Sequence, residues 1–288
     1  MIPRCLDSLN RRTPSRIRRS NSLGGFTVLY PRTCRPVFAT AIALTFVVCV
    51  VGTTKTSYAN TTVKGGVLVR EDVPLHHRTE LLKRLETITG WVRLRFESNG
   101  ALVGNNQQLA GGSKSARNLL TKALTGDALI VLEDARSRSD VAFCRVVPGR
   151  LTNHSILKAR VFVILIDFDD FRQVTGDSQA RAAFDVGWGF LHELHHVVND
   201  SEDPQNANEP GDCEGAINRM RSELDLPLRT SYFYSPFPVK TNPDFNSRLV
   251  RLAFEKQDAT TNRTRRFWLV WDATTVGGFD HNQTAALR

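Results

Sequence analysis

Three histidines and a glutamate occupy residues 192–196, which read HELHH. In an α-helix, residues four positions apart lie about 40° apart around the axis and about 6 Å apart along it. His192 and His196 therefore share one face and can bind one metal ion, in the H-E-x-x-H pattern of zinc enzymes. Glu193 lies about 100° around from His192, where its carboxylate can hold a water on that ion. His195 is rotated away from this face and receives no role.

A catalytic zinc ion needs three protein ligands and one open position, so one more ligand is expected. The spacing that would supply a third histidine is excluded, because Asn199 and Glu202 stand at its glycine and histidine positions. An acid on a later segment remains. We expect Glu214, which lies in the first turns of a helix predicted over 212–224. Three other acids stay open as alternatives: Glu209, Asp212 and Glu223.

The motif and the segment after it resemble the gluzincin-type zincin metallopeptidases, over residues 185–235 at most. In that family a glutamate one helix downstream completes the zinc site, which corresponds here to Glu214. A polar residue four positions later steadies a histidine ligand, and this chain has Asn218 where the family often has aspartate. Residues 212–232 are also similar to zincin effector and Rhs-associated toxin domains. The resemblance implies a zincin-like fold, with a mixed sheet packed on the helix that carries the motif.

These residues predict an enzyme that hydrolyses the amide bonds of a peptide or protein substrate. Zn²⁺ bound by His192, His196 and Glu214 would polarise the scissile carbonyl and lower the pKa of its water. Glu193 would take the proton of that water and pass it to the leaving amine.

The alternative from another class is a non-catalytic exported protein that binds zinc on the same scaffold. Glu193 argues against it, because this residue is not a ligand and has no structural need to stand there. Tyr232 and Tyr234 follow the second helix and could donate a hydrogen bond to the oxyanion. Packing is the other role open to both tyrosines.

The helix that carries the motif is predicted to run from a cap at Asp177 or Ser178 to about Asn199. Its apolar residues cover more than one stripe, which is typical of a buried helix. Gly187 and Gly189 each cost such a helix about 1 kcal/mol relative to alanine. They therefore indicate that its backbone closely approaches a neighbour.

The rest of the mature chain alternates between helical and strand patterns. The last of its predicted strands is continuously apolar, as expected of a central strand buried on both faces. This mixture, with a hairpin that turns at Asn99 and Gly100, indicates the α+β class. The predicted elements are helices over 77–90 and 113–126, a hairpin over 91–104 and strands over 128–133, 141–147 and 159–171.

Of the net charge of +9, +8 comes from the first 59 residues, which hold nine Lys or Arg and one acid. Residues 60–288 are nearly neutral, so we expect no nucleic-acid partner. The basic stretch precedes an uncharged, apolar run over 36–54 and a small-residue site that ends at Ala59. This order predicts a signal peptide over 1–59 and an exported metallopeptidase domain over 60–288. An uncleaved N-terminal membrane anchor is the alternative.

Only two cysteines, Cys144 and Cys213, follow the leader. An oxidising compartment would permit them to pair. Two separate buried thiols are the other interpretation.

Overall fold

The computed structural model describes residues 65–136, 138–149, 160–204, 209–236, 248–258 and 260–276. The predicted signal peptide over 1–59, and with it the boundary of the exported domain, lies outside these residues. Within the described ranges, no helix combines the length and the apolar character needed to cross a membrane.

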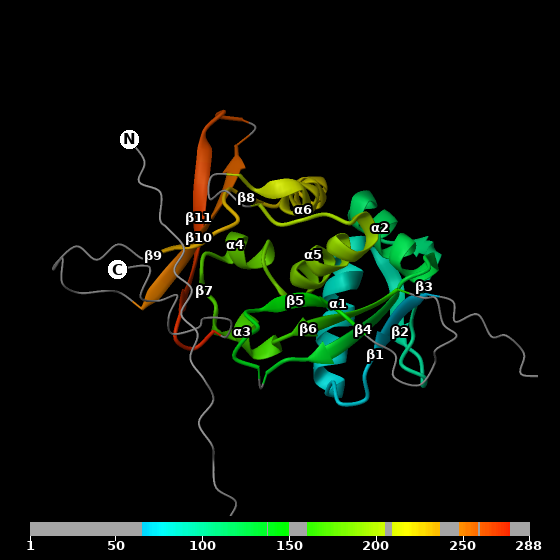
Figure 1. Cartoon of the computed structure of the whole chain (residues 1–288). Coiled ribbons are helices and arrows are strands. Elements are labelled where there is room, and N and C mark those ends of the chain that lie inside the picture. The colour runs from blue at the N-terminus through cyan, green and yellow to red at the C-terminus, as the bar shows by residue number, and fades with distance from the viewer. Residues whose placement is uncertain are drawn as a thin grey trace, which may run out of the picture. The chain divides into compact units, whose positions relative to one another are not determined.

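A four-stranded mixed sheet supports the fold, in the order β1-β4-β6-β5 (Figure 1). β1, β4 and β6 run parallel, and β5 pairs antiparallel with β6 at one edge. The apolar strand predicted over 159–171 is an inner strand of this sheet, but it ends at Ile166. Asp167 ends it, because its carboxylate accepts the amides of Asp169 and Asp170 and caps α3. The bounds are β1 Gly66–Val69, β4 Leu129–Asp134, β5 Cys144–Pro148, β6 Val161–Ile166 and α3 Phe168–Gln173.

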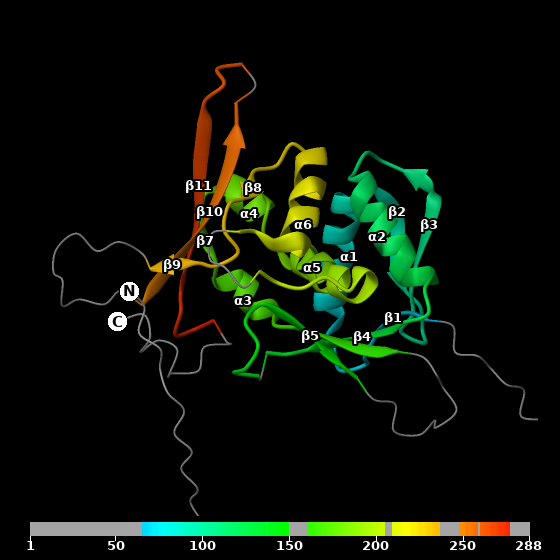
Figure 2. The same cartoon turned by 45° about the horizontal axis from the view of Figure 1, so that its top comes forward.

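The helix with the HELHH sequence, α5, is Val186–Asn199, and it lies at the centre of the helical layer (Figure 2). It packs against β5 and β6 on the sheet side and against three other helices around it. The neighbouring helices are α1 (Leu75–Thr89), α2 (Lys114–Thr125) and α6 (Gly211–Glu223). Its apolar residues join those of α1, α2 and the sheet in the largest hydrophobic core.

The single helix predicted over 178–199 is wrong at its beginning. A short helix, α4, covers Ser178–Ala182, and the helical conformation is then interrupted before α5 begins at Val186. Asp185 causes the break: its backbone is extended, and its carboxylate accepts the amides of Gly187 and Trp188 at 2.8 and 3.2 Å. An N-cap residue has a non-helical backbone, so Asp185 ends the preceding helical segment where it begins α5.

The close approach predicted at the two glycines of α5 is confirmed. A Cβ atom at Gly187 would lie 2.8 Å from the Arg84 Cβ and 2.9 Å from the Ile88 Cδ1 of α1. At Gly189 it would lie 2.8 Å from both the Sγ of Cys144 on β5 and the ring of Phe171. The two glycines therefore let α5 lie directly against the helix and strand that flank it.

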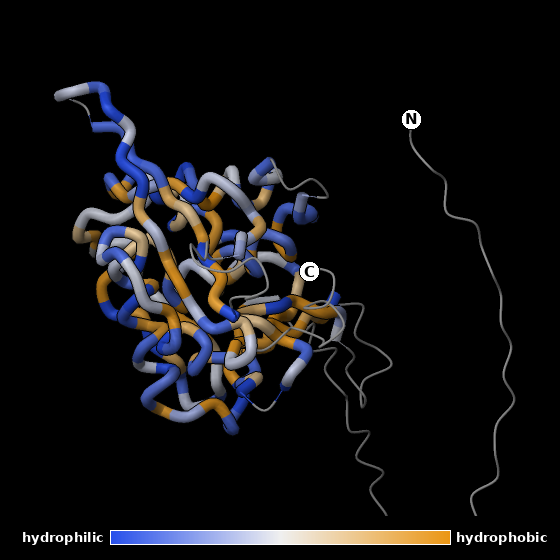
Figure 3. The backbone as a smooth tube through the Cα atoms, turned by 90° about the vertical axis from the view of Figure 1, so that its left-hand side faces the viewer, coloured by the Kyte–Doolittle hydropathy of each residue, from blue (hydrophilic) through white to orange (hydrophobic). Residues whose placement is uncertain are grey.

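A second sheet has the order β7-β11-β10-β8, with β9 paired to β10. Its strand β7 precedes α4 along the chain, and its other strands follow α6. It has its own hydrophobic cluster, built around Phe254 and Leu269. Figure 3 shows hydrophobic residues inside the fold and hydrophilic ones at the projecting turns. The sequence patterns predicted no strands in these segments. The bounds of the strands in this second sheet are β7 Thr175–Gly176, β8 Leu228–Arg229, β9 Ser235–Pro236, β10 Leu249–Gln257 and β11 Thr264–Asp272.

The predicted hairpin is β2 (Trp91–Phe96) paired with β3 (Leu102–Leu109), and Gly100 takes a positive φ of 82° in its turn. The α+β class is confirmed, with a mixed sheet and packed helices. The helix predicted over 212–224 is also confirmed as α6.

Candidate metal centre

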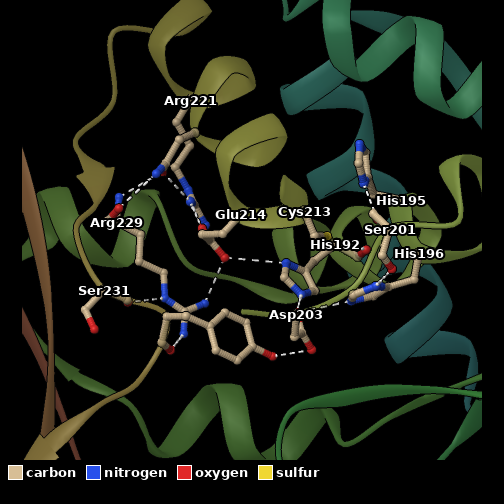
Figure 4. A network of polar contacts seen from close by, with 12 residues as sticks. His192, His195, His196, Ser201, Asp203, Cys213, Glu214, Arg221, Arg229 and Ser231 are labelled. Carbon is tan, nitrogen blue, oxygen red and sulfur yellow. Dashed lines mark hydrogen bonds and ion pairs between the residues drawn. The ribbon is translucent and has the colours of Figure 1, made fainter. Parts of the chain in front are cut away.

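His192 and His196 lie side by side at the C-terminal half of α5, with ring centroids 4.9 Å apart (Figure 4). The Nε2 atoms of both rings face the same carboxylate oxygen, Oδ1 of Asp203, at 3.1 and 3.4 Å. The shared helical face predicted for the two histidines is therefore confirmed. The acid that their Nε2 atoms meet, however, is one that the sequence analysis did not name.

The other ring nitrogen, Nδ1, has a different partner in each histidine. Nδ1 of His192 lies 3.4 Å from Oε2 of Glu214, and Nδ1 of His196 lies 2.6 Å from the carbonyl oxygen of Ser201. Acceptors at Nδ1 favour the tautomer that carries its proton there and leaves Nε2 able to bind a metal. His195 turns away from the pair, as expected, and its Nδ1 contacts the Ser201 hydroxyl.

Asp203 reaches the rings because the chain reverses directly after α5. Asp200 takes the left-handed conformation, with φ 53° and ψ 40°, and so ends the helix. Three residues later the Asp203 side chain, 41% exposed, lies over the histidines. Its second oxygen, Oδ2, accepts the hydroxyl of Tyr232 at 2.7 Å, and the Tyr232 ring stacks near His192.

Glu214, the predicted third ligand, lies beside His192 but is occupied by two arginines. Arg221 donates to its Oε1, and Nη1 of Arg229 donates to its Oε2 at 3.0 Å. The Glu214 side chain is 1% exposed. Burial opposes its ionisation, but the charges of Arg221 and Arg229 prevail and hold its pKa well below the usual range. It is an ionised, buried neighbour of the His192 ring.

The three alternative acids and Asn218 lie elsewhere in the described structure. Glu223 accepts hydrogen bonds from Ser113 and Ser115 at the start of α2. Glu209 and Asp212 make no hydrogen bond or ion pair with either histidine in the part of the chain that is described. Asn218 accepts the Arg221 guanidinium and bonds the backbone of Arg229, so it steadies the arginines that hold Glu214.

Glu193 is attached to the edge strand of the sheet. Its Oε2 accepts the backbone amide of Val146 on β5 at 2.8 Å, and only 8% of the residue is exposed. Burial raises the pKa of the Glu193 carboxyl, partly offset by the charges of His192 and His196. The hydrogen bond fixes the orientation of a carboxyl group whose pKa lies above its usual value, and proton-transferring carboxyl groups are often shifted in this direction.

Cys144 and Cys213 are free thiols, so they do not pair. Cys213 nevertheless belongs to the centre, because ligand atoms of His192, His196 and Cys213 all lie within 4.8 Å of one another. Its Sγ donates to the carbonyl oxygen of His192 at 3.3 Å, and the residue is fully buried. Burial works against the thiolate, but hydrogen bonds from the histidines lower the pKa of Cys213 to about 5.

The charges around the histidines favour their protonated forms in the absence of a metal. Burial disfavours the charged imidazolium of His192, but hydrogen bonds with Asp203, Cys213 and Glu214 raise its pKa well above the usual value. The same balance at His196, again with Asp203 as the largest favourable contact, raises its pKa to about 10. The negative groups that surround the two rings therefore attract a cation.

A cavity of about 480 Å³ opens beside the centre and is lined by His192 and Glu193 at one side. Aromatic side chains from several elements also line it, including Phe143, Phe171, Phe184 and Trp271, together with the charged residues Glu214, Arg221 and Arg229. The rings of Phe143, Phe184 and Trp271 meet edge to face, with centroids 5.1 and 5.4 Å from that of Phe143. A ligand in this cavity would meet apolar walls and the charged residues of the centre.

Comparison of the chain with models of known protein families, with curated proteins and with solved structures finds no match in any of the three. The function therefore has to be argued from the geometry of this centre and its cavity.

Proposed function

We propose that the chain is a zinc-dependent hydrolase of amide bonds with a zincin-like fold, acting on a peptide or protein substrate. One observation carries the proposal: the Nε2 atoms of His192 and His196 converge on one point beside the cavity, and the buried carboxylate of Glu193 lines the same cavity. The mixed sheet, with an antiparallel edge strand beside α5, supports the proposal of a zincin-like fold.

The donor atoms fit a zinc ion. Two imidazole nitrogens and a carboxylate oxygen are zinc ligands, and each histidine has an acceptor at its other nitrogen that fixes the ring. In a tetrahedral site with bonds of about 2.0–2.1 Å, neighbouring ligand atoms lie about 3.3 Å apart. The distances of 3.1 and 3.4 Å from Asp203 to the two nitrogens agree with this value. A zinc ion bound there would supply the Lewis acidity that polarises a carbonyl and activates water.

Glu193 is the proton carrier in this proposal. The amide of Val146 holds its Oε2. Oε1 then accepts a proton from the water that attacks the carbonyl carbon and donates it to the nitrogen of the leaving amine. The hydrogen bond to a rigid strand keeps the carboxylate in one orientation during both transfers.

The cavity supports a preference for substrates with a bulky apolar side chain next to the scissile bond. Its volume of about 480 Å³ exceeds that of a single aromatic side chain, and Phe143, Phe184 and Trp271 line it. Burying such a side chain stabilises the complex by about 25 cal/mol for each Å² of apolar surface removed from water. The basic, apolar leader supports export of the enzyme.

A second candidate is a non-catalytic exported protein that holds zinc structurally through His192, His196 and Cys213. The observation that favours it is the fully buried Cys213 thiol within 4.8 Å of both histidines, since closed structural zinc sites are rich in cysteine. Against it stands Glu193, which such a site would not need.

The test is zinc stoichiometry and peptide cleavage on the full chain, comparing wild type with Glu193→Gln. We expect one zinc ion in each, and cleavage of a broad peptide library by the wild type alone, next to bulky apolar residues. A zinc-loaded wild type whose cleavage equals that of Glu193→Gln would favour the structural zinc protein.

A further inference from the structure

The position of Asp203 distinguishes it from every other acid of the centre. Its Oδ1 is the only oxygen, among the described residues, that ion-pairs with the Nε2 atoms of both His192 and His196. Tyr232 holds the other oxygen, Oδ2, so the carboxylate presents Oδ1 to the histidines in a fixed orientation. This arrangement comes from the left-handed turn at Asp200, which folds the chain back over α5.

Glu214 is a poor ligand in the same structure. Each of its oxygens already accepts a guanidinium, Oε1 from Arg221 and Oε2 from Arg229. Its contact with the histidine pair is at Nδ1 of His192, the nitrogen opposite to the one that faces Asp203. To bind a metal on the Nε2 side, Glu214 would have to leave both arginines, one of which is 2% exposed.

We infer that Asp203 is the third protein ligand of the metal centre, and that Glu214 is a positioning residue that orients the His192 ring. The inference rests on the proposed function, and it replaces the ligand expected from the sequence. A half-exposed carboxylate above the histidines leaves one side of the ion open to water, as a catalytic site requires. Cys213, which is fully buried, would close the site instead.

The first measurement is the zinc dissociation constant of the full chain, determined by competition with a chelator. Asp203→Ala should weaken zinc binding by more than about 100-fold, beyond the roughly 10–100-fold typical when an orienting partner is lost. Glu202→Ala is the matched control, because it removes an exposed acid from the preceding position of the same loop. It should stay within about threefold of wild type, the range left to a screened surface charge.

The second measurement identifies the ligand type without relying on variants of Glu214, which can fail to fold. Wild type loaded with Co²⁺ should show no thiolate-to-metal charge-transfer band, and Cys213→Ser should leave its spectrum unchanged. Zinc binding by Asp203→Ala as tight as that of Glu202→Ala would overturn the inference. So would a charge-transfer band that disappears in Cys213→Ser.

The two proposals fail in different ways. Wild type that binds neither zinc nor Co²⁺ would overturn both the ligand assignment and the zinc-dependent function. Zinc bound through Asp203 without any cleavage that depends on Glu193 would overturn the hydrolase alone and leave the ligand assignment standing.

Discussion

Arg221 donates to Oε1 of Glu214 while the two side chains are only 2% and 1% exposed. The guanidinium also lies over the rings of Trp188 and Phe254, at 5.3 and 5.5 Å, and donates to the carbonyl of Ala183. The pair therefore joins α6 to α5, to the end of α4 and to the second sheet. The Arg221–Glu214 pair therefore has a structural role that does not depend on a bound metal.

Glu214→Gln should destabilise the metal-free protein by about 3–5 kcal/mol, because it leaves the buried charge of Arg221 uncompensated. Urea unfolding in the presence of a chelator measures this. Asp212→Asn removes an exposed acid from the first turn of the same helix and should cost less than about 1 kcal/mol. Similar losses for the two variants would show that the pair contributes little to the fold.

The relative positions of His192, Glu193 and His196 could be predicted because their geometry is local. Four residues of a regular helix bring His192 and His196 to one face wherever the helix lies. The identity of the third acid depends on tertiary structure. Glu214 has the spacing of a ligand, but its two carboxylate oxygens accept hydrogen bonds from Arg221 and Arg229, seven and fifteen residues later.

Asp203 could not be selected from periodicity, because it lies in a loop. What brings it over the rings is a left-handed residue, Asp200, at the end of α5. Aspartate adopts that conformation more readily than most residues, so it was the one local signal available. The break before α5 was similarly readable at Asp185, whose type is preferred at helix N-caps, but the apolar pattern continued through it.

Gly189→Ala should destabilise the protein by about 1 kcal/mol or more, although alanine favours a helix. The added methyl group would meet the Sγ of Cys144 and the ring of Phe171 at 2.8 Å, and overpacking of this kind costs about 1–3 kcal/mol. Gly215→Ala in α6 is the matched control, since its Cβ would have no neighbour within 4 Å. It should stabilise the protein by about 0.5–1 kcal/mol.

Thermal or urea unfolding of both glycine variants tests the packing of α5 against β5. Cys144→Ala should partly rescue Gly189→Ala, because it removes one of the two atoms that clash. If both glycine variants gain stability, α5 does not lie as close to the strand as described.

His77 should make the stability depend on pH. Burial, followed by the charges of His76 and Arg172, lowers its pKa, and its Nδ1 lies 3.5 Å from the buried Oδ2 of Asp134. Between the unfolded pKa of about 6.5 and the lower folded value, the unfolded chain binds a proton that the native protein does not. The stabilisation is therefore complete above about pH 6.5 and is lost as the pH falls, at up to about 1.4 kcal/mol per pH unit.

The measurement compares urea unfolding of wild type and His77→Gln from pH 5 to 7.5 in a chelating buffer, so that other titrating groups cancel in the difference. The difference in unfolding free energy should shrink as the pH falls below about 6.5. His76→Gln, at an exposed neighbouring position, serves as the control and should retain most of the wild-type slope. A slope in His77→Gln equal to that of wild type would assign the dependence to another group.

Glu193→Gln should keep its zinc while cleaving peptides about 10²–10⁴-fold more slowly, because the amide cannot accept the proton of the attacking water. The substitution keeps the size of the side chain, and its amide oxygen can still accept the Val146 amide at the edge of the sheet. Initial cleavage rates on a peptide library, together with zinc content, measure both effects. Glu202→Gln, on the exposed loop after α5, should cleave at the wild-type rate and controls for the loss of one negative charge. If Glu193→Gln loses its zinc as well, the carboxylate supports the metal rather than the proton transfer, and the base has to be sought among other residues that line the cavity.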